Sequence, residues 1–297
     1  MKSVQRIFIS GDKWLYFKIY TGVKTADRII AKDMSAVMNK IAEKELVDKW
    51  FFIRYNDPDF HLRLRILVKD TMYIGEIIHL FSQQFQNLIK TNEVWKIQLD
   101  TYSRELERYY IFLIEEAESI FYIDSECVLS IIKSLNKFQD ENYRWMIALK
   151  MIDSFLSAFS LNIEKKQELL KNMSNSFKQE FGFNKYNSKQ FNAKFRHNRK
   201  TIESVLNKTI NDSNFQSLIL PLKKKSRKLK PIISLINKKT KLSKAVIDIN
   251  SLLSSYIHMS MNRLFRSKNR LHELIIYDFM YRYYTSEIAR RKNIKKE

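Results

Sequence analysis

Hydrophobic and polar residues follow two kinds of spacing in the first hundred residues. Residues 14–20 (WLYFKIY) are rich in aromatic and β-branched side chains, which favours a strand. Residues 24–47 and 72–91 have helical spacing. The strand-like runs KWFFIRY and HLRLRILV flank the turn-forming sequence NDPDF, which predicts an antiparallel hairpin. A further strand is predicted at residues 93–101.

From about residue 115 the spacing is almost wholly helical. Apolar residues recur three and four positions apart in 115–134, 142–162, 201–220, 243–265 and 270–290. Residues 184–200 form a looser polar part. A lysine cluster at residues 223–230, bracketed by Pro221 and Pro231, is interpreted as an exposed loop or helix end.

These elements predict an α+β fold. We expect one domain over residues 1–297, with an antiparallel sheet and helices in residues 1–112. Residues 113–297 would form a largely helical part packed on it. Only four glycines and three prolines are present, which agrees with a helix-rich chain.

The second strand of the hairpin has two chemically different faces. Because side chains alternate along a strand, His61, Arg63 and Arg65 share one face. The other face consists of Leu62, Leu64 and Ile66. Arg54 adds a guanidinium to the first strand. Such groups are costly to bury unless they meet an anion such as a carboxylate or phosphate. An exposed strand face, or Arg–Glu pairs within the fold, would explain the same pattern.

Two helical segments carry further candidates. In DTYSRELERYY, Arg104 and Arg108 share a face if the segment is helical, although salt-bridged solvent helices have the same pattern. In HMSMNRLF, His258 and Asn262 share a helix face. A histidine titrates near neutral pH and suits proton transfer, but a lone helical histidine is more often structural.

The net charge and the sequence motifs limit the classes of function to which this chain can be assigned. The 53 basic and 32 acidic residues give a formal charge of +21, which favours an acidic partner, unless the lysines are merely solvated. The single cysteine, Cys127, excludes internal disulfides and multi-cysteine metal sites. Metalloprotease, P-loop and dinucleotide-binding motifs are absent. Without a membrane-spanning run or signal-peptide pattern, we expect a cytoplasmic protein.

Several segments, taken in order, resemble one family. WLYFKIY, WFFIRYNDPDFHLRLRI, DTYSRELERY, AESIFYIDSECVL and HMSMNRLFRSKNRLHELIIYDFMYRYY are similar to the C-terminal elimination domain of lantibiotic dehydratases. This domain also occurs as a free-standing protein in thiopeptide-type bacteriocin biosynthesis. The resemblance spans nearly the whole chain. Since no large glutamylation domain precedes these segments, the stand-alone form is expected.

The resemblance implies a lyase that expels glutamate from glutamylated Ser or Thr of a ribosomally made precursor peptide. Dehydroalanine or dehydrobutyrine would remain. The implied partners are the precursor peptide, a glutamylating dehydratase that uses glutamyl-tRNA, and possible other biosynthetic enzymes. No metal or organic cofactor is implied.

The family motifs also imply roles for individual residues. Arg63, Arg65, Arg108 and His258 are the expected catalytic residues. His258 would remove the α-proton, Arg63 and Arg65 would stabilise the enolate-like charge, and Arg108 would hold a glutamyl carboxylate. The expected substrate-binding residues are His61, Arg54, Arg104 and Asn262.

One departure from the family affects the position of Arg108. The family often has two glycines after this motif, where the present chain has Tyr110 and Ile111. If the backbone differs there, Arg104 is the expected substitute for Arg108.

Two other functions remain open at this stage. Relatives of the same fold in thiopeptide pathways are pyridine synthases, which join two dehydroalanines by a formal [4+2] cycloaddition and release the leader peptide. A third hypothesis is a non-catalytic binding module for an acidic leader peptide or tRNA, which would suit the basic charge. The chain has no recognised nucleic-acid-binding motif.

Overall fold

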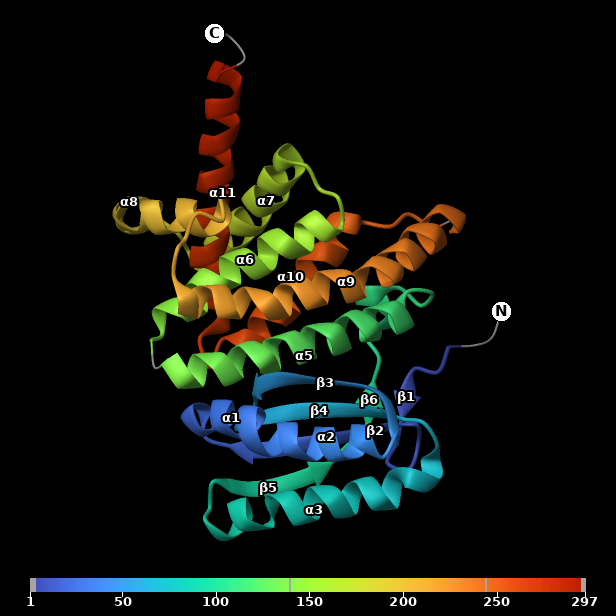
Figure 1. Ribbon diagram of the computed structural model, residues 1–297. Helices are drawn as coiled ribbons and strands as arrows, with labels where there is room; N and C mark the ends of the chain where they lie inside the picture. The colour runs from blue at the N-terminus through green and yellow to red at the C-terminus, as the bar shows by residue number, and fades with distance from the viewer. Residues whose placement is uncertain (1–3, 139, 244, 295–297) are drawn as a thin grey trace.

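The computed structural model describes residues 4–138, 140–243 and 245–294. It is 69% helix and 13% strand, with the sheet in the N-terminal part, which confirms the predicted α+β class. Figure 1 shows the sheet and its covering helices at one end of the molecule and a stack of long helices at the other.

An antiparallel four-stranded sheet lies at the centre of the N-terminal part. Its strands are β2 (Trp14–Thr21), β3 (Val47–Asn56), β4 (Phe60–Val68) and β5 (Val94–Leu99). The strand order is β3-β4-β2-β5, and β3 and β4 form the predicted hairpin. A separate short ladder joins β1 (Ile7–Phe8) to β6 (Tyr102–Ser103).

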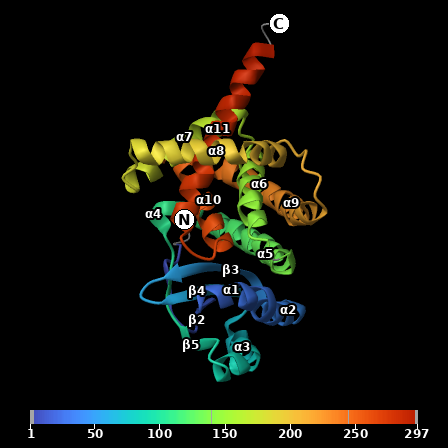
Figure 2. The ribbon, with the colours of Figure 1, turned by 90° about the vertical axis from the view of Figure 1, so that its left-hand side faces the viewer.

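Helices cover one face of this sheet (Figure 2). They are α1 (Val23–Ile29), a π-helical segment (Ile30–Met34), α2 (Ser35–Glu43) and α3 (Ile74–Lys90), with a short 3₁₀ turn (Thr71–Tyr73) before α3. Phe81 of α3 stacks on Phe17 of β2 at 4.2 Å between ring centroids. Phe17 is paired with Leu64, and Leu64 is fully buried, so this is the predicted apolar face of β4. His61, Arg63 and Arg65 therefore lie on the opposite face.

The long helices follow the sheet in the chain. They are α4 (Leu106–Tyr109), α5 (Ile114–Phe138), α6 (Asn142–Ala158), α7 (Ile163–Glu180), α8 (Lys185–Leu206), α9 (Ser213–Leu242), α10 (Ile249–Leu264) and α11 (Asn269–Ile294). The segments predicted at 115–134, 142–162, 243–265 and 270–290 correspond to α5, α6, α10 and α11.

Side chains from α5 and α10 complete the hydrogen bonds of the edge strand β3. Asn262 accepts from the Arg54 N–H and donates to the Arg54 carbonyl, each at 2.9 Å. Arg263 Nε donates to the Phe52 carbonyl at 2.7 Å, and the Phe52 N–H donates to Ser125 Oγ at 3.2 Å. These bonds occupy positions where another strand would pair, so they attach the helical part to the sheet.

Three sequence predictions in the helical part were wrong. Residues 185–200 lie within α8, whose start is capped by Asn184, and the predicted helix 201–220 is interrupted between α8 and α9. The pattern was misleading because α8 buries only Ile202, Val205 and Leu206, all near its end.

The lysine cluster is the third of these errors. It lies in the middle of α9, with both Pro221 and Pro231 inside the helix. Neither proline belongs to the buried stripe, which consists of Phe215, Leu218, Leu222, Lys225, Leu229, Ile233 and Ile236. Packing of that stripe offsets the hydrogen bonds that the two prolines remove.

Candidate active site

A cavity of about 470 Å³ lies among α4, α7, α10 and α11 and contains His258. His258 is contributed by α10, Arg108 by α4, and Arg270, Glu273 and Tyr277 by α11. The remaining lining residues are Leu169, Asn172, Met173, Ser176, Phe177, Asp248, Asn250, Ser251, Ser254 and Ser255. The hydroxyl, amide and basic groups suit a polar substrate with an anionic part.

His258 is held by a buried carboxylate. Its Nδ1 lies 3.0 and 2.9 Å from the two carboxylate oxygens of Glu273. The Tyr277 hydroxyl donates to Glu273 Oε2 at 2.7 Å. Glu273 and Tyr277 are fully buried, whereas the His258 side chain is 28% exposed. Only the imidazole of this trio is therefore open to the cavity.

Two arginines lie at the same cavity. Arg108 Nη1 is 3.0 Å from Glu105 Oε2, and both side chains are largely exposed. Arg270 Nε donates to Glu180 Oε1 at 2.6 Å, in another exposed pair. Exposed pairs of this kind contribute about 0–1 kcal/mol, so a substrate carboxylate can compete for either arginine.

The backbone after Arg108 adopts the conformation that a glycine would favour. Tyr110, two residues after Arg108, has φ 61° and ψ 135°. A non-glycine residue there carries strain of about 1–3 kcal/mol. The Tyr110 hydroxyl accepts from the Asp248 N–H at 3.0 Å, which ties this turn to the start of α10. The departure from glycine therefore does not move Arg108 away from the His258 cavity.

Arg63 and Arg65 lie outside that cavity, on the face of the sheet opposite to α1–α3. Arg63 Nε donates to His61 Nε2 at 3.0 Å, and its guanidinium lies 3.3 Å from the Tyr55 ring centroid. The Arg65 guanidinium lies 4.5 Å from the Tyr16 ring centroid. Stacking of this kind holds an arginine in place and leaves its donors available.

Buried donors without partners accompany Arg65. Within the described residues, Arg65 Nε, the Tyr16 hydroxyl and the Tyr109 hydroxyl are buried and make no hydrogen bond. Burial raises the pKa of both tyrosines, so both hydroxyls remain protonated donors. Buried polar groups are nearly always hydrogen-bonded, so Arg65 Nε and the hydroxyl of Tyr16, whose ring contacts Arg65, are suited to receive an anion or water.

Aromatic rings connect Arg65 with α10, the helix that carries His258. The Arg65 guanidinium lies 5.4 Å from the Phe51 ring centroid, and Phe51 contacts Phe121 at 5.3 Å. Phe121 contacts Tyr109 at 5.0 Å, and Tyr109 stacks on Tyr256 of α10 at 5.6 Å. Figure 2 shows α4, which carries Tyr109, between the sheet and α7. Four packed rings thus lead from Arg65 to α10, where Ser255, next to Tyr256, lines the cavity.

Three other predicted substrate-binding residues have partners inside the fold. Arg54 is 2% exposed and pairs with Asp27 at 2.6 Å. Arg104, the predicted substitute for Arg108, binds both carboxylate oxygens of Glu118 at 2.7 Å. Asn262 is occupied by the β3 backbone, as described above. The polar groups of these three side chains are therefore directed at partners within the fold.

His61 also has two partners, which define its tautomer. Its Nδ1 lies 2.8 Å from the Asp59 carbonyl, and its Nε2 accepts from Arg63. Burial lowers the pKa of His61. A neutral His61 with the proton on Nδ1 satisfies both contacts and orients Arg63.

Sequence reasoning missed Glu273, Tyr277 and Arg270. Glu273 lies 15 residues after His258, in the next helix, so no periodicity links the two. A carboxylate in the otherwise apolar run HELIIY was the available signal, since an acid in such a run requires a buried partner.

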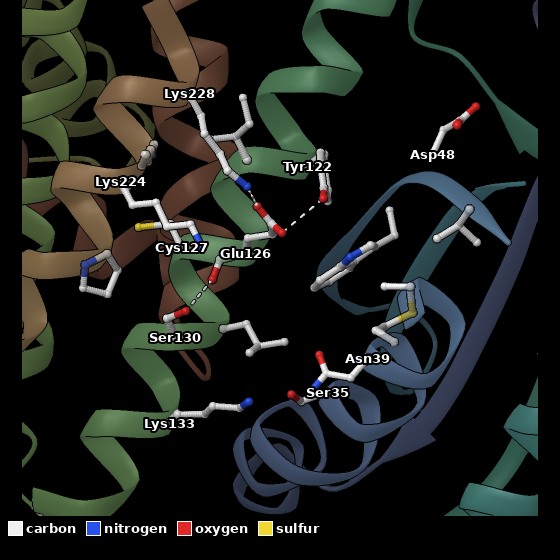
Figure 3. Close-up of a pocket in the computed structure, with 18 of the residues that line it drawn as sticks. Ser35, Asn39, Asp48, Tyr122, Glu126, Cys127, Ser130, Lys133, Lys224 and Lys228 are labelled. Atoms are coloured by element: carbon white, nitrogen blue, oxygen red, sulfur yellow. Dashed lines mark hydrogen bonds and ion pairs between the residues drawn. The ribbon is translucent and has the colours of Figure 1, made fainter. Parts of the chain in front are cut away.

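A second cavity, of about 450 Å³, lies between α2, α5 and α9 and has several lysines in its wall. Lys228 donates to Glu126 at 2.5 Å, and the Tyr122 hydroxyl donates to the same carboxylate at 3.1 Å (Figure 3). Lys225 pairs with Asp124. Acids within the fold therefore occupy Lys225 and Lys228 of this wall, whereas the His258 cavity offers an imidazole beside two arginines.

Neither a metal centre nor a membrane span is visible in the described residues. They contain no group of three or more His, Cys, Asp or Glu side chains arranged to hold a metal ion. No helix among residues 4–138, 140–243 and 245–294 is long and apolar enough to cross a bilayer.

The architecture defines an α+β protein with an arginine-bearing sheet face beside a histidine-containing helical cavity. The model of the family described as lantibiotic biosynthesis dehydratase C-term matches residues 14–284. The chain therefore belongs to this family.

Known relatives extend the comparison. The nisin biosynthesis protein NisB of Lactococcus lactis subsp. lactis is 25% identical over 283 residues, which cover 93% of this chain and 26% of NisB. The chain thus spans about a quarter of that relative. The solved tRNA-dependent lantibiotic dehydratase MibB of Microbispora sp. 107891 has a TM-score of 0.73 at 15% identity, over 96% of this chain and 29% of MibB.

A pyridine synthase shares the fold as well. TbtD, from thiomuracin biosynthesis, has a TM-score of 0.61 at 11% identity, over 93% of this chain and 99% of TbtD. At such identities the two structural similarities show the fold alone, so the fold does not distinguish dehydration from pyridine formation.

Proposed function

We propose that this chain eliminates glutamate from glutamylated Ser or Thr residues of a precursor peptide and so forms dehydroalanine or dehydrobutyrine. The observation that carries the proposal is His258, with Nδ1 against the buried Glu273, at a cavity that also contains Arg108. A base beside an anion-binding group is what a β-elimination with a carboxylate leaving group requires.

In the proposed reaction, His258 Nε2 takes the α-proton of the esterified residue. The electrons of the C–H bond form the new double bond, and the bond from the β-carbon to the ester oxygen breaks. Glutamate leaves as a carboxylate, and the imidazolium later returns its proton to water. The reaction needs no oxidant or reductant.

The arginines have separate tasks. Arg63 and Arg65 would stabilise the charge that develops as the proton is removed, and beside Arg65 the buried Tyr16 hydroxyl makes no hydrogen bond within the described residues. Arg108 holds a carboxylate of the glutamyl group, in competition with Glu105. The substrate would lie across α4, between the sheet face and the cavity.

The partners belong to the same proposal. A glutamylating dehydratase that uses glutamyl-tRNA would supply the substrate, because esterification must precede elimination. Support comes from the length of NisB, of which the match covers only 26%. The precursor peptide would present the glutamylated residue to the cavity.

The test uses a synthetic peptide that carries a glutamyl ester on serine. Mass spectrometry follows the loss of glutamate and the appearance of dehydroalanine. We expect turnover by the unaltered protein and a decrease of about 10²–10⁴-fold for His258→Ala. His197→Ala, at an exposed position of α8, is the matched control and should retain full activity.

Two results would contradict the proposal. If His258→Ala, Arg63→Ala and Arg65→Ala all release glutamate at the normal rate, elimination does not occur at this site. If the unaltered protein leaves the ester intact but converts a bis-dehydroalanine peptide to a pyridine, the protein is a cyclase.

A further inference from the structure

We propose that Glu273, supported by Tyr277, is a positioning residue that fixes the tautomer of His258 and stabilises its protonated form. This inference rests on the proposed function, because it deepens the role of the same histidine. It goes beyond the expected catalytic set, which contains neither Glu273 nor Tyr277.

Glu273 differs from the other buried acids in the described residues. Asp27, Glu118, Asp124 and Asp278 each lie against an arginine or lysine, as do Asp33 and Glu116. Within the described part of the chain, the one ion-pair partner of Glu273 is His258. A buried carboxylate is costly without a cation, and here the cation exists only after the imidazole accepts a proton.

The hydrogen bonds determine which imidazole nitrogen can act as the base. An ionised carboxylate only accepts, so the proton of neutral His258 must be on Nδ1, where both Glu273 oxygens lie. The lone pair is then on Nε2. When Nε2 takes the substrate proton, the imidazolium forms beside the carboxylate, and Glu273 remains ionised.

Tyr277 keeps Glu273 in place. Its hydroxyl donates to Oε2 from one helical turn further along α11, and its ring packs against Phe177 at 5.3 Å. Burial and the neighbouring Glu273 raise the pKa of Tyr277 well above its usual value, so the hydroxyl remains a donor at any working pH.

Other charged groups also face His258 and must be considered in any pH experiment. They are Arg108 of α4, Glu180 at the end of α7, Asp248 at the start of α10, and Arg270 of α11. Arg270 pairs with Glu180, and Arg108 pairs with Glu105. None of them contacts the imidazole as Glu273 does, so a change at Glu273 should dominate.

The kinetic test is Glu273→Gln in the complete chain, with the glutamyl-ester peptide as substrate. We expect kcat to fall about 10²–10⁴-fold with KM little changed. The acidic limb of the kcat/KM profile should move to lower pH, because the carboxylate no longer stabilises the imidazolium. Glu168→Gln, at an exposed position of α7, is the matched control. An unmoved acidic limb in a folded Glu273→Gln protein would overturn the inference.

A second measurement needs no activity. Nitrogen-15 spectra of the imidazoles should show neutral His258 with its proton on Nδ1, and protonation at lower pH in Glu273→Gln. His258→Gln assigns the signal among the five histidines. A proton on Nε2 in the unaltered protein would contradict the inference. If the spectra agree but no glutamate is released, the proposed function fails and the inference stands.

Tyr277→Phe is a second variant, which tests the same proposal if Glu273→Gln does not fold. It removes one hydroxyl and retains the ring that contacts Phe177. We expect about a tenfold lower kcat and an acidic limb shifted in the same direction, by less than in Glu273→Gln. A Tyr277→Phe protein with the normal rate and profile would remove Tyr277 from the proposal.

Discussion

The arginines of the sheet region fall into two groups with opposite environments. Arg54 is buried and paired with Asp27, in a cluster that two more arginines join at 2.6 Å. Arg63 and Arg65, from the next strand, contact aromatic rings and a neutral histidine instead. Asp100, the acid whose pKa Arg63 helps to lower, pairs with Lys18.

This difference separates arginines that hold the fold together from arginines available for an anion. Asp27 is surrounded by Arg54, Arg144 and Arg266, which come from three distant segments. Burial would raise the pKa of Asp27, but the three guanidinium groups together lower it. The first group thus has carboxylate partners inside the protein, Asp27 and Glu141, whereas Arg63 and Arg65 form no ion pair within the described residues.

The largest expected effect is on stability, from Asp27→Asn. Removing the carboxylate leaves the buried Arg54 without an acid and leaves Arg144 and Arg266 with only Glu141, so the free energy of unfolding should fall by about 3–5 kcal/mol. Urea unfolding measures the change. Asp48→Asn, at an exposed position of β3, should change the free energy of unfolding by about 0.5 kcal/mol or less. If Asp27→Asn and Asp48→Asn lowered the free energy of unfolding equally, the Arg54 group would not stabilise the fold in the way described above.

The second prediction concerns function. Arg65→Gln should slow glutamate elimination by about 10²–10³-fold, because a donor for the developing charge is lost. The free energy of unfolding should change by only about 1 kcal/mol, since no buried carboxylate depends on Arg65. Rates on the glutamyl-ester peptide and urea unfolding are measured on the same sample. A loss of 3 kcal/mol or more in stability would place Arg65 with the structural arginines.

The sequence predicted one of these groups better than the other. Faces of a hairpin follow from alternation alone, so the shared face of His61, Arg63 and Arg65 was correct before any contact was known. The same alternation could not show that Arg54 is neutralised, because Asp27 lies in a separate helix.

Contacts between distant segments also explain the other features that could not be predicted from the sequence. Glu273 meets His258 only because α10 and α11 pack together, and the helix through the lysine cluster depends on packing that overrides two prolines. The segments around Arg108 and His258 could be assigned from their motifs. Their meeting at one cavity required the fold.

The smallest expected effect is on the pH dependence of stability and concerns His61. This histidine, rather than a carboxylate, accepts the hydrogen bond from Arg63. Burial lowers the pKa of His61 below its usual value near 6.5, so folding favours neutral His61. Its contribution to stability is therefore fully present above pH 6.5 and is lost as the pH falls through the folded-state pKa. Protonated His61 would also repel Arg63, because Nε2 could no longer accept its hydrogen bond.

His61→Gln removes this titration. Urea unfolding of both proteins at pH 7.5 and pH 5 should show that the stability advantage of the unaltered protein shrinks at the lower pH. His197→Gln, exposed on α8, should show no such change. An advantage that grows as the pH falls would mean that His61 is charged in the folded protein. Arg63 would then require an anion near it even without substrate, and the contrast with Arg54 would disappear.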